Sequence, residues 1–417
     1  MKKSVLLIIV IFAPLFPASG NTGDANNLVT LDDYLRYAIA NNAGLKSGLE
    51  QWNAAKEQIP QAKSLPDPQL SFGYATASTP QRREFEVMQP FPWFGTIDAR
   101  TDAASARAQS ARQQFQSQKL QIIFQVKQAF YDYCYLASAT QISKENVELA
   151  RHFEEIVRSR YAVSAASHPD VIRSQIETAK FENALTALEK SRPALIARLN
   201  SLLNRPLSSD LSWPEMPGYE PPSIDSNNIL ALAVRNNPQI WMLKYDIDAA
   251  ALDQKLAEKK YYPDFGLGVS VDSGMGHNGS DRVMAKVSVS LPIWRGNYNA
   301  AERQAKAQKE QITQQKIQLA NDLLARARQV IYEIENGERE IRLYSDTIIP
   351  KTKEMLAASE SAYQANTIDF LNLIDAQRAL LDNQLYYQRA VFDNAKKLAE
   401  IEMLTGADLP AKNVGIK

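Results

Sequence analysis

The side chains that could do chemistry are few and scattered along this sequence. Its histidines stand far apart, at His152, His168 and His277, Cys134 is the only cysteine, and no two methionines have a spacing typical of ligands. Because a metal site needs several such ligands close together, we expect no metal site and no cofactor. The sequence also carries no recognisable pair of catalytic carboxylates, glycine-rich phosphate loop or nucleophile with its base, so we expect no catalytic residue and no enzyme.

The composition excludes several further classes of protein. The 417 residues include 47 basic and 47 acidic side chains, so no net positive field is available to hold nucleic acid. A single cysteine excludes a disulfide framework, and Cys134, between two tyrosines on an expected helix, should pack as a small residue. An apolar fraction of 45% and a mean hydropathy of −0.33 exclude a polytopic helical membrane protein. By composition alone, the chain resembles a soluble protein.

Charged side chains with an informative spacing lie on four short segments in which apolar and polar residues alternate. A period of two is the pattern of strands with one apolar and one polar face. The polar face carries four charged residues that would suit the wet lumen of a membrane barrel: Glu84, Glu86, Asp272 and Lys286. The strands are expected near 68–76, 84–91, 263–272 and 283–291, and about nine residues suffice to cross a bilayer when tilted. Alternatively, they form two hairpins on a soluble core.

A membrane barrel made of these strands would need more than one chain. Four strands cannot close a barrel, and open sheet edges are not tolerated in lipid. Several copies must then share one barrel, and three copies would supply twelve strands, within the range of bacterial barrels. The membrane interpretation therefore predicts an oligomer.

The segments that end the second strand of each predicted hairpin combine proline, aromatic residues and glycine. Pro92 and Pro292 would stop the strand ladder, and Gly95 and Gly296 would free the turn into the following helix. The neighbouring Trp and Phe side chains suit a membrane interface, although ordinary core packing would also explain them.

The tips of the predicted β-hairpins, near 77–83 and 273–282, are polar and would face outside. In the first tip, Arg82 and Arg83 could contact the phosphates of lipopolysaccharide, or they could form a solvated turn. Outer membrane lipid is therefore a candidate partner of the chain.

Short matches recur in order along the chain, for example Tyr131 with Tyr332 and Tyr161 with Tyr363, at an offset that drifts only from 195 to 202. Such an ordered series indicates a tandem duplication. We expect a signal peptide at 1–20, a first repeat at 21–208, a Pro-rich connector at 209–225, a second repeat at 226–409 and a C-terminal tail at 410–417.

Each repeat should begin with a shorter helix, near 31–63 or 226–260, and end with two long helices. The long helices are expected at 96–161, 169–205, 297–363 and 369–405, the third with a kink at Pro350. At about 1.5 Å per residue, the first would reach roughly 100 Å. The predicted fold is mainly α with a small β part, and its helices span a distance rather than enclose a compact core.

At this point the chain resembles the TolC-type outer membrane efflux family over nearly all of its mature length. The resemblance lies in the duplication, the strand–Pro–Gly–helix junctions, the segments Tyr161–Gln175 and Tyr363–Gln377, and the run from Asn372 to Arg378. It implies a homotrimer with a shared twelve-stranded barrel in the bacterial outer membrane and a long α-helical barrel in the periplasm. It also implies two partners, an inner-membrane efflux pump and a periplasmic adaptor, also called a membrane fusion protein.

The resemblance places a constricted periplasmic entrance where the helices turn back, near 161–170 and 363–372. The candidate entrance residues are Tyr363, Asp369, Asn372 and Asp375. Three copies of Asp375 around one axis would favour cations or raised pKa values, although a solvated surface aspartate would have the same sequence pattern.

The same turns should dock the adaptor, and the candidate residues are Ser164, Ala165, Asn366 and Thr367. The sequence departs here from the family pattern, because Ser164 and Asn366 stand where relatives often carry glycine, and Asn372 stands where many carry aspartate. Serine adopts a left-handed turn poorly. A basic residue that could lock the second turn is expected to be missing, because Ile368 and Phe370 flank Asp369.

The resulting functional prediction is an exit duct of a tripartite efflux system. It would form a continuous aqueous path and perform no covalent chemistry. Two alternatives stay open from the sequence: a periplasmic coiled-coil adaptor or scaffold without a channel, and a general diffusion porin, which would need more strands and far less helix.

Overall fold

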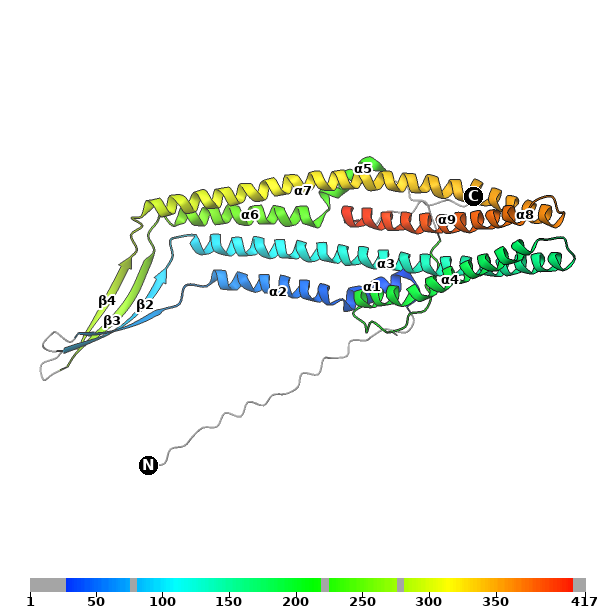
Figure 1. Ribbon diagram of the computed structural model, residues 1–417. Coiled ribbons are helices and arrows are strands. Elements are labelled where there is room, and N and C mark those ends of the chain that lie inside the picture. Colours follow the sequence, from blue (N-terminus) through cyan, green and yellow to red (C-terminus); the bar gives the residue numbers. More distant parts are fainter. Residues whose placement is uncertain (1–27, 76–80, 219–224, 276–280, 408–417) are drawn as a thin grey trace, which may run out of the picture.

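The computed structural model describes residues 28–75, 81–218, 225–275 and 281–407. The expected signal peptide, most of the first β-hairpin tip, part of the connector and the expected C-terminal tail lie outside these ranges. The described chain is a long stack of helices with a small sheet at one end (Figure 1). It is mainly helical with a small β part, as the sequence predicts.

The same order of elements occurs in both halves of the chain. The first half contains α1 (Leu31–Asn41), α2 (Ala43–Lys63), β1 (Gln69–Ala75), β2 (Gln81–Phe91), α3 (Thr96–Ala162) and α4 (His168–Leu203). The second contains α5 (Ser226–Arg235), α6 (Pro238–Lys259), β3 (Phe265–Met275), β4 (Arg282–Val289), α7 (Arg295–Leu343), a π-helical turn (Tyr344–Ile348), α8 (Ile349–Gln364) and α9 (Phe370–Thr405).

Each of the two shorter helices expected from the sequence is in fact interrupted by an asparagine. Asn42 and Asn237 both leave the helical conformation, with ψ 124°, and their side-chain oxygens cap the helix that follows. Their side-chain nitrogens donate to the last helical turns of the same half: Asn42 to the Leu202 carbonyl at 2.7 Å and Asn237 to the Leu404 carbonyl at 3.0 Å. These bonds fasten the start of each half to its end.

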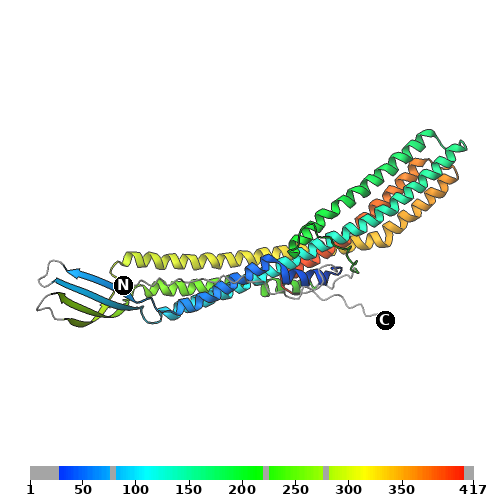
Figure 2. The ribbon, with the colours of Figure 1, turned by 90° about the horizontal axis from the view of Figure 1, so that it is seen from below.

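The long helices are close to the lengths expected. α3 has 67 residues without interruption, which at about 1.5 Å per residue is roughly 100 Å. The corresponding helix of the second half passes through the π-helical turn immediately before Pro350, where the sequence predicts a kink. Proline has no N–H for the helical ladder, and an extra residue in the turn accommodates this. The helices bend in the middle of the stack (Figure 2).

The four strands form one antiparallel sheet in the order β1-β2-β3-β4. Three of them run further into the expected β-hairpin tips than the alternation predicts, because β2 begins at Gln81, β3 ends at Met275 and β4 begins at Arg282. The register aligns one apolar face across all four strands, with Phe72 opposite Phe85, Phe85 opposite Val271, and Val271 opposite Val283. β1 and β4 form the two edges of the sheet.

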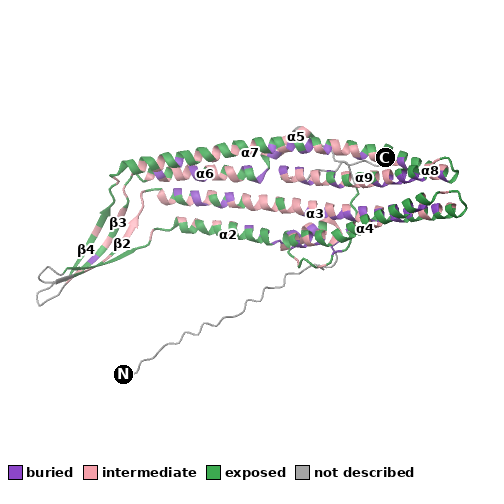
Figure 3. Cartoon of the chain, in the orientation of Figure 1, coloured by how far each residue is buried: buried purple, intermediate pink, exposed green. Residues whose placement is uncertain are grey.

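Burial is concentrated between the helices, and the sheet is mostly exposed (Figure 3). On the apolar face of the sheet, Leu70 keeps 75% and Val283 72% of its surface exposed. The helical cores are narrow; the one around Tyr34 and Phe130 includes Cys134, which is fully buried as expected, and burial raises the pKa of its thiol to about 12. Within the described ranges, no helix combines the length and hydropathy needed to span a bilayer.

Candidate functional site

The two turns between long helices lie side by side at the end of the stack opposite the sheet (Figure 1). We call these turns, 163–167 between α3 and α4 and 365–369 between α8 and α9, the helical tips. They close in the same way: the Ala165 amide donates to the Arg160 carbonyl at 2.8 Å, and the Thr367 amide donates to the Ala362 carbonyl at 2.9 Å. This is the six-to-one hydrogen bond of a Schellman motif.

Both helical tips contain a non-glycine residue in the left-handed conformation. Ser164 has φ 59° and Asn366 has φ 65°. Asparagine tolerates this region and serine does so poorly, yet the same backbone hydrogen bonds hold both. The fixed turn geometry therefore overrides the preference of Ser164.

Arg160 of α3 connects the two helical tips. Its guanidinium donates to the carbonyls of Tyr363 at 2.5 Å and Gln364 at 2.8 Å, and to Oδ1 of Asn366 at 2.7 Å. It also lies 4.7 Å from the centroid of the Tyr363 ring and donates to the carbonyl of Ala165. The expectation that no basic residue locks the second turn is wrong. The lock comes from Arg160 in the first helical hairpin, α3 and α4, and holds the turn of the second helical hairpin, α8 and α9.

The four candidate entrance residues have different environments. Tyr363 is 4% exposed and packs against Phe370, so its ring belongs to the core beneath the tips, and burial raises the pKa of its hydroxyl. Asp369 caps α9 and holds both the backbone and the side chain of Asn372. Asp375 has 58% of its side chain exposed, with Arg378 3.3 Å away. Of the four, Asp369 and Asp375 offer exposed charges.

A buried ion pair joins α4 to α9 about two helical turns behind the tips, and its arginine, Arg378, also contacts Asp375. Glu177 of α4 is 4% exposed, accepts a hydrogen bond from Arg378 Nε of α9 at 3.1 Å and forms an ion pair with Arg378 Nη2 at 2.6 Å, while Lys180 lies 2.9 Å away. Burial raises the pKa of Glu177, but the hydrogen bonds from Arg378 and Lys180 outweigh it, so that the net pKa lies below the ordinary value.

Arg160, Glu177 and Arg378 were missed as functional residues from the sequence. Arg160 and its partner Tyr363 are 203 positions apart, and Glu177 and Arg378 are 201 apart. The repeat offset of 195 to 202 is the one sequence signal that could have paired them, since equivalent segments of the two halves pack together. The candidate docking residues Ser164, Ala165, Asn366 and Thr367 are all exposed at the tips.

The polar face of the sheet carries the candidate lumen residues. Lys286 of β4 reaches across β3 to β2, where its amino group contacts Glu84 and lies 2.7 Å from Glu86. Asp272 of β3 is directly opposite Glu84 in the register. The four charged side chains thus lie on one face, opposite to the exposed apolar side chains.

The two strand-to-helix junctions are built differently. After Pro92, Gly95 has φ 69° and immediately precedes α3, so a left-handed glycine makes the turn into this helix. Gly296 lies inside the first turn of α7, whose cap is Trp294, so its expected role in freeing the turn is wrong. Pro292 lies between β4 and α7, and Trp93 in the other junction stacks on Tyr262 at 5.0 Å.

Across the described ranges, no three His, Cys, Asp or Glu side chains are grouped closely enough to hold a metal ion. The site features of the described chain are a polar sheet face at one end of the long helical stack and two linked tips at the other end.

Comparisons with known proteins agree with this architecture. The family model described as outer membrane efflux protein matches residues 35–205 and 229–407. Cobalt-zinc-cadmium resistance protein CzcC of Cupriavidus metallidurans is 21% identical over 403 residues, covering 94% of this chain and 92% of CzcC. Among solved structures, the outer-membrane channel OprN superposes with a TM-score of 0.78 at 16% identity, covering 90% of each chain. The outer membrane protein VceC of Vibrio cholerae gives 0.77 at 16% identity, covering 91% of this chain and 97% of VceC.

The similarity to solved structures shows the fold, and the match to the family model shows the family. Its two matches together cover well over half of the chain, one in each half, which confirms the resemblance drawn from the duplication and the junctions. The chain belongs to the outer membrane efflux protein family.

Proposed function

We propose that this protein is the exit duct of a tripartite efflux system, placed in the outer membrane with its helical part in the periplasm. The observation that carries the proposal is the sheet, whose exposed apolar face and charged polar face lie back to back at one end of the long helical stack. Lipid would contact the first face and water the second. The family match supports the same function.

The duct requires a homotrimer. β1 and β4 are open edges of a four-stranded sheet, and unpaired backbone groups are not tolerated in lipid. Pairing β4 of one protomer with β1 of the next would give a twelve-stranded barrel after three copies. Glu84, Glu86, Asp272 and Lys286 would then line its lumen, and the helical stacks would close into one periplasmic tunnel.

The helical tips would form the periplasmic entrance and the docking site of the adaptor. Arg160 and the Glu177–Arg378 pair hold the two hairpins of each protomer together there, so opening the entrance would require these bonds to rearrange. Asp375 is the exposed charge behind the tips. Ser164, Ala165, Asn366 and Thr367 would contact the adaptor, through which an inner-membrane pump delivers its substrate.

Fractionation and complementation test the proposal. Expressed with a matching adaptor and pump in a host that lacks its own duct, the chain should restore efflux and appear in the outer membrane as a trimer that dissociates on heating. A soluble periplasmic monomer would contradict the duct and favour a coiled-coil adaptor or scaffold. A trimer that conducts ions but restores no efflux would contradict the tripartite role.

A further inference from the structure

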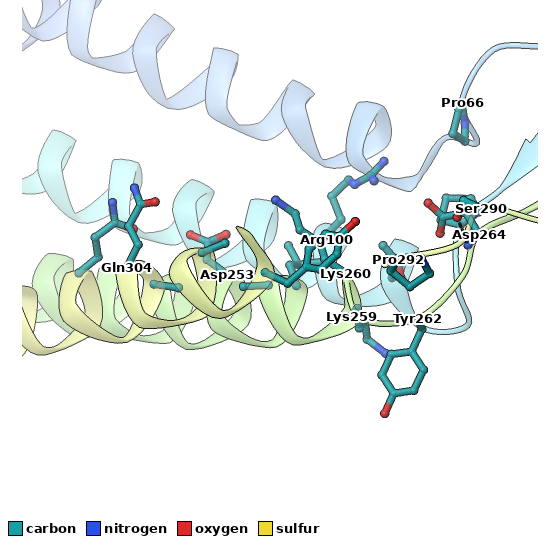
Figure 4. A pocket seen from close by; sticks show the side chains of 18 of the residues that line it. Pro66, Arg100, Asp253, Lys259, Lys260, Tyr262, Asp264, Ser290, Pro292 and Gln304 are labelled. Atoms are coloured by element: carbon teal, nitrogen blue, oxygen red, sulfur yellow. Dashed lines mark hydrogen bonds between the residues drawn. The ribbon is translucent and has the colours of Figure 1, made fainter. Parts of the chain in front are cut away.

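A cavity of about 830 Å³ lies where the sheet meets the helices. It is lined by the start of α3, the end of α6 and the start of α7, together with both strand-to-helix junctions (Figure 4). We call it the junction cavity. Neither the entrance nor the docking surface includes it.

The strand alternation shows which side of the sheet the junction cavity belongs to. Asp264 and Ser290 line it, and they continue the even-numbered positions that form the polar face of β3 and β4. The two residues extend the ladder beyond the strands, because the Asp264 amide donates to the Ser290 hydroxyl at 2.8 Å and the Ser290 amide donates to the Asp264 carbonyl at 2.9 Å. In the proposed trimer, this face is the lumen.

The charge of the junction cavity is positive. Its lining has four basic side chains, Arg100, Arg107, Lys259 and Lys260, but only two acidic ones, Asp253 and Asp264.

Most of these groups already have partners. Arg107 pairs with Asp253 at 2.5 Å, Lys259 donates to the Phe94 carbonyl at 2.9 Å, and Asp264 accepts from the Trp93 amide at 2.8 Å. Arg100 and Lys260 are exposed, and their charged side-chain groups have no hydrogen-bond or ion-pair partner among the described residues.

We propose that the junction cavity is an anion-binding site in the lumen, formed by Arg100 and Lys260 and suited to phosphate or carboxylate groups of molecules that pass through the duct. Two unpaired cations in a concave site lined by protein attract anions more strongly than the same charges on a flat surface do. The amino end of α3 lies nearby without a side-chain cap, and Asp98 in its first turn offsets part of the positive helix dipole. Three copies would form a positive collar between the barrel and the helical tunnel.

Phosphate binding tests the site directly and does not require an open entrance. At low salt, the purified trimer should broaden the phosphorus resonance of inorganic phosphate. Arg100→Gln combined with Lys260→Gln should weaken the apparent affinity by roughly tenfold or more. Lys255→Gln is the matched control, since Lys255 is an exposed cation on α6 outside the cavity. No broadening with the wild type, or equal broadening with the double variant, would overturn the proposal.

Bilayer recordings separate a lumenal site from one that faces lipid headgroups. Under a potassium chloride gradient, the reversal potential of the double variant should shift toward potassium selectivity relative to wild-type pores, because both carry the same acidic residues at the lumen face and the entrance and differ only at the junction cavity. An unchanged reversal potential would overturn the lumenal assignment. The inference rests on the proposed duct, and light scattering distinguishes the two failures: a trimer without a phosphate site defeats only the inference, whereas a monomer defeats the duct as well.

Discussion

Arg160 of α3 holds the carbonyl of Tyr363 at 2.5 Å and stacks its guanidinium 4.7 Å from the centroid of the same residue's ring. One side chain thus donates to carbonyl groups at the end of α8 while its guanidinium lies over the core aromatic ring of Tyr363. Lysine could reproduce the charge of this contact but not the fork of donors. The relationship makes Arg160 the main polar link between the two helical tips.

Replacing Arg160 should therefore loosen the proposed entrance. Arg160→Ala removes the hydrogen bonds to the second hairpin, and we expect single-pore conductance in planar bilayers to rise several-fold, with faster amide hydrogen exchange at residues 363–367. Arg160→Lys should give an intermediate result. Arg158→Ala is the control, because Arg158 is exposed and its ion-pair partner among the described residues is Glu154 of the same helix. Equal conductance of Arg160→Ala and wild-type pores would refute the lock.

A bulky charge at a helical tip should abolish efflux while the trimer still assembles. Ala165 is exposed, and its side chain takes part in no hydrogen bond of the turn, so Ala165→Glu tests docking more cleanly than a change at Asn366, which accepts from Arg160. We expect drug or metal resistance to fall to the level of a strain without the duct. The control Ala358→Glu, at an exposed position of α8 away from its tip end, should retain resistance. Unchanged resistance with Ala165→Glu would remove the docking assignment.

The Glu177–Arg378 pair should make the tip region sensitive to acid. The folded pKa of Glu177 lies below its ordinary value of 4.5, so its stabilising contribution is complete above that value and is lost as the pH falls through the folded pKa. Arg378→Ala should cost about 2 kcal/mol at neutral pH, because it leaves a buried carboxylate with Lys180 as its main partner. Thermal melts followed by circular dichroism between pH 3 and pH 7 (about the range that spans the carboxyl titration) would measure both effects. In Glu177→Gln, the fall in melting temperature between pH 7 and pH 3 (roughly the carboxyl range) should become smaller. An unaltered pH profile would show that Glu177 does not cause the acid sensitivity.

The two left-handed positions should respond differently to glycine. Ser164→Gly relieves a conformation that serine adopts at a cost of roughly 1 kcal/mol, so the apparent melting temperature of the helical signal should rise. Asn366→Gly should raise the melting temperature less, because asparagine already tolerates this conformation. The glycine variant also loses the hydrogen bond that Asn366 accepts from Arg160. If the two glycine variants shifted the melting temperature equally, the backbone argument would be wrong.

Much of the fold follows from local patterns in the sequence. The alternation at Phe265–Val271 and Val283–Val289 predicts both the strands and their faces, because side chains on a pleated strand must point alternately to opposite sides. The long helix from Thr96 could be predicted because no glycine or proline interrupts it up to Ala162. Both depend only on neighbouring residues.

The errors arise where distant segments decide the outcome. Asn42 sits within a helical pattern, and its break is stabilised by the local cap at Leu45 and by the carbonyl that Leu202 offers in the folded chain. Arg160 has its partners in the other repeat. Tyr363 is predicted as an entrance residue from the sequence, but in the structure it is buried against Phe370. Periodicity within one segment carries no information about such contacts.

The open edges of the sheet also affect the protein before it assembles. Until neighbouring chains arrive, β1 and β4 present unpaired N–H and C=O groups beside exposed apolar side chains such as Phe72 and Val283. Edges of this kind pair with one another and promote aggregation. A newly exported chain therefore needs either rapid oligomerisation or a chaperone that shields these strands, and its cellular abundance should depend on that protection as much as on the stability of the finished duct.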